Sequence, residues 1–140
     1  MNASTELAPQ KLAARQVPDD QRIETLPRHF GRYMMRVEDA VYTFMRDLAP
    51  DYRGGYWHFY ELSNGGFYMA PQLGPLDIQV DGNGYAGRMS ADAAGITACL
   101  FAFSHLSFQF QNDVISRHYY ALRDFALEHA EATAIFAAID

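Results

Sequence analysis

The sequence predicts an α+β fold, in which a small antiparallel sheet of two hairpins packs with about four to five helices in a single domain. Two observations lead to this prediction. Short aromatic or alternating segments with Asn-Gly turns lie in the middle of the chain, and segments with apolar residues at helical spacing lie on either side. Strands and helices are thus segregated rather than alternating, which is typical of α+β proteins. The 140 residues suffice for one core.

The first 25 residues are predicted to form a flexible N-terminal arm, so that the domain spans residues 26–140. The arm mixes Ala, Gln, Pro and charged residues with little periodicity. This composition does not favour a packed structure, although one short helix around Pro9 to Arg15 is compatible with it.

A first long helix is predicted from about Arg32 to Ala49. Apolar residues recur there on one helical face, which is predicted to line the core. These residues are Val37, Val41, Phe44, Met45 and Leu48. Pro50 ends the helix.

A first hairpin is predicted within DYRGGYWHFYELSNGGFYMAP, from Asp51 to Pro71, which is rich in aromatic residues. Asn64-Gly65 indicates a two-residue type I′ turn that pairs Leu62 with Phe67. Because strand side chains alternate, one face then carries Tyr56, His58, Tyr60, Leu62, Phe67 and Met69, and the other Trp57, Phe59, Glu61, Tyr68 and Ala70. Either helices cover both faces, or one face stays partly open as an aromatic contact surface.

A second hairpin is predicted within residues 76–89, where apolar and polar residues alternate before an Asn83-Gly84 turn. The predicted register places Ile78 opposite Met89 on the inside and Gln79 opposite Arg88 on the outside.

Three helices are predicted after the hairpins. Ser90 is the expected N-cap of a central helix that reaches about Phe110 and is apolar nearly all round. The next runs from Asp113 to Glu128, with Asp113 and Arg117 paired on its outer side. The last is short, from Glu131 to Ile139.

Composition limits the possible functions. A net charge of -6 and a pI near 5.2 argue against an exposed nucleic-acid groove. The single cysteine, Cys99, excludes an internal disulfide and fits a reducing cytosol. No signal peptide or membrane anchor is predicted.

No pattern predicts a catalytic, cofactor or metal site. The five histidines lack HExxH and paired Cys/His spacing. Residues 81–92 resemble a calcium loop only faintly, because Tyr85 and Ala86 stand where a ligand and a glycine are needed. Cys99 lies in an apolar run that blunts thiol reactivity. An acid-base pocket built on His58 and Glu61 is the enzymatic alternative.

Arginine and aromatic side chains are favoured anchors at protein interfaces, and they supply the candidate partner-binding residues. Three arginines spaced four apart stack along one side of a helix if Gly31 does not break it. Alternatively, they form a solvated face with carboxylates such as Glu24 or Glu38. The predicted partner-binding set is Arg28, His29, Arg32, Arg36, Tyr56, Trp57, His58, Tyr60, Glu61, Asn64, Tyr68 and Asp140.

Four blocks of sequence resemble the ArdB/KlcA antirestriction family of plasmids and other mobile elements. They are LPRHFGRYMMRVE at Leu26 to Glu38, the hairpin segment at Asp51 to Pro71, VDGNGYAGRMSADAAGI at Val80 to Ile96, and FAAID at Phe136 to Asp140. The resemblance implies a non-enzymatic protein in the cytoplasm of a bacterial host. It also implies protection of incoming plasmid or phage DNA against type I restriction-modification enzymes.

Charge density argues against DNA mimicry as the mechanism. Ten base pairs of duplex present about 20 negative charges over about 34 Å, whereas this whole chain nets -6. The predicted partner is therefore the type I restriction-modification complex or a host factor that controls it, with no direct nucleic-acid or membrane contact. The alternatives are a small enzyme and a general host-factor binding module.

Overall fold

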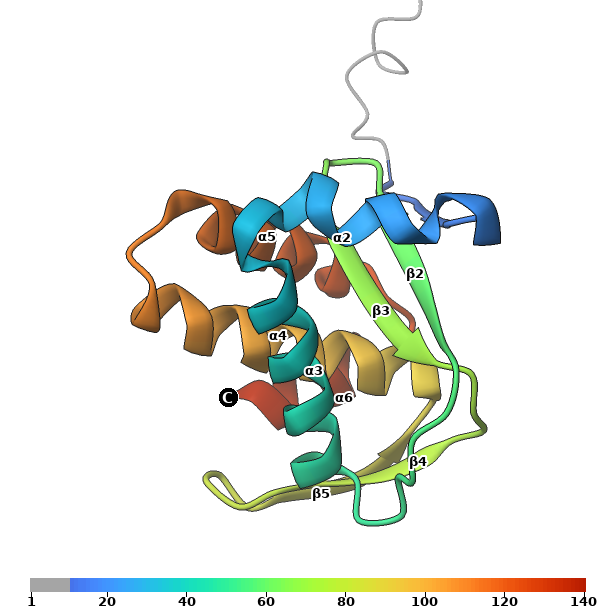
Figure 1. The fold of residues 1–140 in the computed structure, drawn as a ribbon. Helices are drawn as coiled ribbons and strands as arrows, with labels where there is room; N and C mark the ends of the chain where they lie inside the picture. Colours follow the sequence, from blue (N-terminus) through green and yellow to red (C-terminus); the bar gives the residue numbers. More distant parts are fainter. Residues whose placement is uncertain (1–10) are drawn as a thin grey trace, which may run out of the picture.

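A computed structural model describes residues 11–140 and confirms the α+β fold in a single domain (Figure 1). Within these residues there are two antiparallel sheets and five α-helices. The strands are β1 (Ala14–Gln16), β2 (Trp57–Leu62), β3 (Phe67–Pro71), β4 (Leu76–Val80) and β5 (Tyr85–Met89). The helices are α2 (Arg22–Phe30), α3 (Met34–Leu48), α4 (Ala91–Gln109), α5 (Asp113–Leu127) and α6 (Ala132–Ile139).

The two predicted hairpins belong to separate sheets. One sheet has the order β1-β2-β3 and the other consists of β4 and β5. The first sheet therefore gains a strand from the segment expected to be an arm. Within it, Arg15 lies opposite Glu61, and the Val17 N–H donates to the Phe59 carbonyl at 2.8 Å.

The expected short helix around Pro9 to Arg15 is wrong where the structure describes that segment, because residues 14–16 form a strand. Residues 1–10 of the expected arm lie outside the described residues. The strand escaped sequence analysis because its partner lies more than forty residues further along the chain, and because all three of its residues are exposed.

The first hairpin has a register one residue away from the predicted one. Glu61, not Leu62, lies opposite Phe67, and the turn is a three-residue loop that ends on Gly65 at φ 88°. The Leu62 N–H donates to the Gly66 carbonyl, which closes this loop. A shift of one residue exchanges the faces of β3 relative to β2. Phe67 therefore shares a face with Phe59 instead of with Tyr60.

The second hairpin differs from its predicted register by two residues, which leaves its faces unchanged. Val80 lies opposite Tyr85 across a four-residue loop, and Gly84 there has φ 76°. Ile78 is fully buried as expected. Arg88 pairs with Asp77 rather than facing Gln79.

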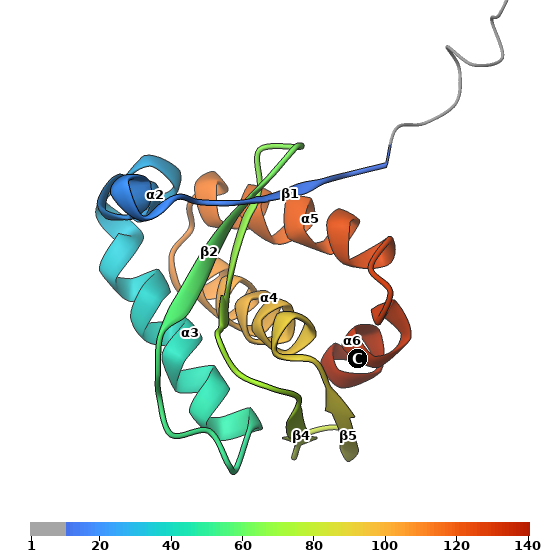
Figure 2. The same ribbon diagram turned by 90° about the vertical axis from the view of Figure 1, so that its right-hand side faces the viewer.

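The predicted central helix is confirmed as α4. The Ser90 hydroxyl caps it by accepting from the Ala93 N–H at 3.1 Å. Figure 2 shows α4 in the middle, with α3, α5 and α6 around it. It is long and apolar enough to span a membrane, but 67% of it is buried inside the fold, so its apolar surface is that of a core helix.

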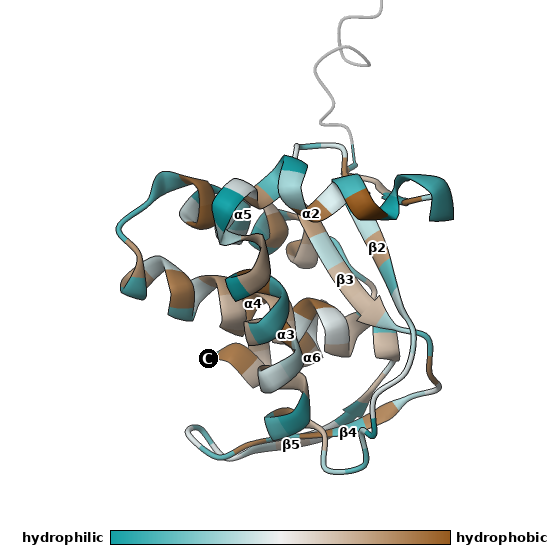
Figure 3. Ribbon diagram, in the orientation of Figure 1, coloured by the Kyte–Doolittle hydropathy of each residue, from teal (hydrophilic) through white to brown (hydrophobic). Residues whose placement is uncertain are grey.

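The other predicted helices are confirmed with small changes at their ends. α3 begins at Met34, after a short 3-10 turn, and buries Val37 and Val41 on the predicted face. Figure 3 shows both apolar and hydrophilic residues along α3, as expected for a helix that packs one side on the core and exposes the other to solvent. On α5 the buried residues are Ile115, His118, Leu122 and Ala126. The expected pair of Asp113 with Arg117 is not among the ion pairs within residues 11–140.

Candidate functional site

Glu61 on β2 binds three cationic or imidazole side chains from two other elements. Arg15 of β1 donates to Glu61 Oε1 at 2.6 Å, and Arg28 of α2 donates to Oε2. His29 Nε2, also on α2, lies 2.7 Å from Oε2. We call these four residues the Glu61 cluster. It ties the end of β2 to both β1 and α2.

The Glu61 cluster fixes the protonation of its members. Burial by itself favours the neutral form of Glu61, but the hydrogen bonds from Arg28, His29 and Arg15 outweigh burial and lower the pKa of Glu61 to about 2. Glu61 is therefore a carboxylate at neutral pH and can only accept hydrogen bonds. It follows that His29 Nε2 carries a hydrogen.

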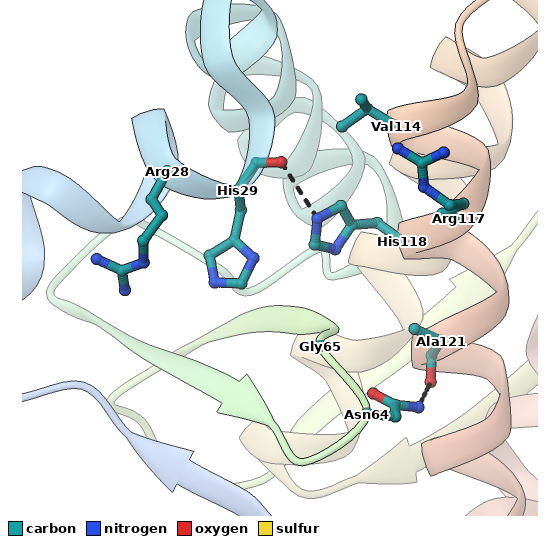
Figure 4. A pocket seen from close by; sticks show the side chains of 8 residues that line it. All are labelled: Arg28, His29, Asn64, Gly65, Val114, Arg117, His118 and Ala121. Carbon is teal, nitrogen blue, oxygen red and sulfur yellow. Dashed lines mark hydrogen bonds between the residues drawn. The ribbon is translucent and has the colours of Figure 1, made fainter.

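A pocket of about 380 Å³ lies beside the Glu61 cluster, between α2, the turn after β2 and α5 (Figure 4). We call it the α2–α5 pocket. Its polar lining comes from Arg28, His29, Asn64, Arg117 and His118, and no acidic residue within 11–140 lines it. Asn64 holds the turn in place, because its amide donates to the Ala121 carbonyl at 2.9 Å and accepts from the Gly66 N–H at 3.1 Å.

His118 is the most buried polar group of the α2–α5 pocket, with 8% of its surface exposed. Its Nε2 lies 3.2 Å from the His29 carbonyl, which can only accept, so Nε2 carries the hydrogen. The ring packs 4.4 Å from Phe30. Burial, together with the nearby His29 and Arg117, lowers the pKa of His118 to about 4. Its Nδ1 is buried without a hydrogen-bond partner within the described residues.

We expect His118 to make the fold lose stability on mild acidification. Its pKa of about 4 in the folded state lies below 6.5, so between these values the unfolded chain binds a proton that the folded chain does not. Its contribution is complete above pH 6.5 and falls by about 3 kcal/mol by pH 4. Urea unfolding of the wild type and of His118→Gln at several pH values tests this. An equal pH dependence between pH 6.5 and 4.5 in both proteins contradicts it.

Two tyrosines of the predicted set belong to a second connected group. Tyr60 and Tyr68 stack with ring centroids 4.6 Å apart, although sequence analysis placed them on opposite faces. The Tyr68 hydroxyl donates to Asp92 at 2.7 Å, and His129 Nε2 lies 2.8 Å from the other oxygen of Asp92. Burial opposes ionisation of Asp92, but these two hydrogen bonds prevail and lower its pKa. The group joins β3 to α4 and to the turn between α5 and α6.

At the start of the hairpin, the predicted residues differ in exposure. Trp57 is buried, with 3% of its surface exposed, and donates from Nε1 to the Tyr52 hydroxyl at 2.8 Å. Tyr56 is 45% exposed and donates to Asp19 at 3.1 Å. His58 Nδ1 contacts the Gln16 amide at 3.2 Å. Trp57 therefore belongs to the core, whereas Tyr56 lies on the surface.

The enzymatic alternative needs His58 and Glu61 to face one another, and the structure separates them. Three positions apart on one strand, they point to opposite faces and have different partners. Burial also raises the pKa of the Cys99 thiol to about 12. Within residues 11–140, no cluster of three His, Cys, Asp or Glu side chains could hold a metal ion.

The predicted arginine row does not form, because Gly31 with φ 54° ends α2. Arg28 binds Glu61 rather than Glu24 or Glu38. Arg32 lies over the Tyr33 ring at 5.1 Å, and Arg36 lies over Phe110 at 5.6 Å. Asp140 ends the chain after α6, and Figure 2 shows this end far from α2. The structure thus brings Arg28, His29, Glu61 and Asn64 together at one site and stacks Tyr60 on Tyr68 at another.

Sequence reasoning missed Arg15, Arg117 and His118. A signal for His118 was present, because it stands three residues after Ile115 and four before Leu122 in an otherwise apolar stripe. Arg15 gave no such signal, since its importance depends on pairing with a distant strand.

Comparison with known proteins gives consistent matches. A family model described as "Antirestriction protein" matches residues 50–140. "Antirestriction protein KlcA" of Escherichia coli is 49% identical over 137 residues, covering 94% of this chain and 96% of the relative. "Putative antirestriction protein YubI" of Escherichia coli K12 is 33% identical over 131 residues, covering 89% and 93%.

A solved structure extends the match to three dimensions. It comes from work on the KlcA and ArdB proteins, described as having a novel fold and antirestriction activity against type I DNA restriction systems in vivo but not in vitro. Its sequence is 49% identical to this chain, the TM-score is 0.88, and the match covers 100% of both chains.

Proposed function

Because the chain belongs to the antirestriction protein family, we propose that it protects incoming plasmid or phage DNA from type I restriction-modification enzymes without imitating DNA. It acts as a non-enzymatic protein in the bacterial cytoplasm, through a specific protein contact or an indirect route. Its partner is the type I restriction-modification complex or a host factor that controls that complex.

The observation that carries this proposal is the low net negative charge of the chain. A DNA mimic needs an array of uncompensated carboxylates at phosphate-like density. Here Glu61 is bound by Arg15, Arg28 and His29, and Asp77 is paired with Arg88. These pairs neutralise only part of the acidic charge, and it is the net charge of only -6 that favours recognition by shape and by specific side chains.

The behaviour of the KlcA and ArdB proteins supports the indirect route. Activity in vivo but not in vitro is expected when a cellular component or state is missing from the purified reaction. A DNA mimic, by contrast, needs only the enzyme. A host factor, or a state of the restriction enzyme that exists only in cells, accounts for this difference.

The surface around α2 and α3 is the best candidate for the contact. Arg32 and Arg36 are exposed and stack on aromatic rings, and Arg28 keeps 48% of its side chain exposed beside Glu61. Arginine and aromatic groups are enriched among the residues that dominate interface energies. We place the partner contact on this surface.

A DNA competition assay tests the mechanism. The purified protein is expected not to displace duplex DNA from a type I restriction enzyme at about 50 mM salt, because it lacks the free charges of a polyanion. Gel-shift or anisotropy measurements with increasing protein give the readout. Displacement that weakens steeply by about 200 mM salt is the signature of a mimic, and it overturns the proposal.

Cross-linking in cells tests the contact itself. A photo-cross-linking amino acid is placed at Arg32 and, as a control, at the exposed Leu73. Restricting cells are then challenged with unmodified DNA. Capture of a restriction subunit or of one defined host protein from position 32 alone supports the proposal. Equal capture from both positions, or capture from neither, counts against a contact on this surface.

A further inference from the structure

The α2–α5 pocket contains a polar atom that the fold leaves unused. His118 Nδ1 is buried and lacks a hydrogen-bond partner within the described residues. Because Nε2 donates to the His29 carbonyl, the Nδ1 of the neutral ring carries a lone pair and accepts hydrogen bonds. Buried polar atoms in proteins are almost always paired, and an exception points to a missing water, ion or ligand.

The charge around this atom favours an anion. Arg28 and Arg117 line the pocket, whereas none of the acidic residues that the structure describes does. Glu61 lies behind His29 but is shared among Arg15, Arg28 and His29. Arg117 has no carboxylate partner in the part of the chain that the structure describes. A region of net positive charge therefore exists in a chain that is acidic overall.

The unpaired His118 Nδ1 requires a hydrogen-bond donor, and the two arginines favour an anion. These two requirements together select the ligand. An anion satisfies the arginines, but a carboxylate or sulfate has no hydrogen to give to His118 Nδ1. We propose that the α2–α5 pocket binds a phosphate group that retains a hydroxyl, either inorganic phosphate or a phosphate monoester. Arg28 and Arg117 donate to the phosphate oxygens, and the P–OH group donates to His118 Nδ1. This proposal does not rest on the antirestriction function proposed above, although Arg28 also lies on the surface proposed for the partner contact.

The size of the pocket agrees with such a ligand. Its volume of about 380 Å³ is that of roughly a dozen water molecules at about 30 Å³ each. A phosphate group and part of the molecule that carries it fit within this space. Nδ1 itself is not accessible to solvent, so the proposal requires the side chains that line the pocket to shift as the hydrogen bond forms.

The need for a P–OH group also excludes nucleic acid as the ligand of this pocket. The phosphodiesters of DNA carry negative charge but no P–OH group, so they leave His118 Nδ1 unpaired. An unpaired buried group is a strong basis for rejecting a close analogue. The pocket thus distinguishes a free phosphate or a monoester from the DNA backbone.

Binding is coupled to a proton. The charged or titratable groups around His118 are Arg28 and His29 on α2, Arg117 on its own helix, and Glu61 on β2, which binds His29. From α4, the Phe103 ring packs near His118. The complex holds one proton between the phosphate and His118. A monoester loses its second proton near pH 6, so above that pH the complex must take one up from water.

This coupling gives a sharp prediction. Phosphoserine affinity is expected to fall about tenfold per pH unit above pH 7, because one proton is taken up. If arginines alone formed the site, phosphoserine affinity would instead rise as the pH rises, because the dianion binds guanidinium more tightly than the monoanion does. Isothermal titration of the full-length protein between pH 6 and 8 separates the two.

The test compares inorganic phosphate, phosphoserine, sulfate and dimethyl phosphate as probes. We expect phosphate or phosphoserine to bind with a Kd of about 1 mM or tighter, and sulfate and the diester about tenfold or more weakly. Tighter binding of phosphoserine than of phosphate identifies a monoester as the ligand, and the reverse identifies the free ion. No binding of either, or sulfate binding as tight as phosphate, overturns the proposal.

Two variants locate the site. Arg117→Gln is expected to weaken phosphate binding, whereas Arg123→Gln on the same helix, whose guanidinium lies over Phe136, is not. His118→Gln keeps a donor for the His29 carbonyl but replaces the ring Nδ1 with an amide oxygen at a different position on the side chain, so it is expected to weaken the preference for phosphate over sulfate. Equal effects of the two arginine variants contradict the assignment, and this comparison holds even if His118→Gln folds poorly.

Discussion

Replacing Gly95 by alanine is expected to lower the free energy of unfolding by about 3 kcal/mol or more. A Cβ atom at this position of α4 meets the Met69 carbonyl oxygen at 2.5 Å and the Ala70 Cα at 2.6 Å. Both are backbone atoms of β3 and cannot move aside as a flexible side chain can. The helix therefore has to separate from the sheet.

The direction of this effect is the reverse of that in an ordinary helix, where alanine is about 1 kcal/mol more favourable than glycine. Gly82→Ala is a suitable control, because no atom lies within 4 Å of its added Cβ and its φ is not positive. We expect that variant to stay within about 0.5 kcal/mol of the wild type. Urea and thermal unfolding give both values. Wild-type stability for Gly95→Ala contradicts the close packing of α4 on β3.

Replacing Glu61 by glutamine is expected to cost about 2 kcal/mol. It leaves Arg15, Arg28 and His29 without their shared carboxylate, and Glu61 has only 18% of its side chain exposed. The cost is less than for a fully buried pair because the two arginine side chains are about half exposed and partly screened by solvent. Hydrogen exchange is expected to become faster in β1, which the cluster holds against β2.

Asp77→Asn serves as the matched control for Glu61→Gln. Its ion pair with Arg88 joins side chains that are 53% and 63% exposed, so its loss is expected to cost less than about 1 kcal/mol. The pKa of Glu61 is lowered to about 2 from 4.5, so its stabilisation is present above pH 4.5 and is lost as the pH falls towards 2. Glu61→Gln lacks this acid-dependent loss. Similar costs for both variants contradict a special role for the Glu61 cluster.

Comparison of the two hairpins explains which sequence predictions hold. Both turns were predicted as two-residue turns at Asn-Gly, and both are longer. In the second hairpin the shift is even, so Ile78 remains buried. In the first it is odd, so the predicted faces of β3 are exchanged and Tyr68 joins Tyr60. The identity of a turn residue alone does not fix loop length, because here Asn64 also bonds to Ala121 on a distant helix.

The candidate site was only partly predictable. Arg28, His29, Glu61 and Asn64 were singled out for their side-chain chemistry, but their grouping around one carboxylate and one pocket was not foreseen. The arginine row failed at Gly31, whose positive φ ends α2. His118 was assigned no role, although its place in an apolar stripe indicated that it is buried.

The amino-acid sequence determined the family, the long helices with their core faces, the Ser90 cap and the low density of free charge. These properties depend on residues close together along the chain or on composition. Only the tertiary structure decided the strand register, the joining of Arg15 to Glu61 across 46 positions, and the burial of His118 Nδ1. Ion pairing and desolvation act between groups that are close in space, and spacing along a chain does not encode that distance.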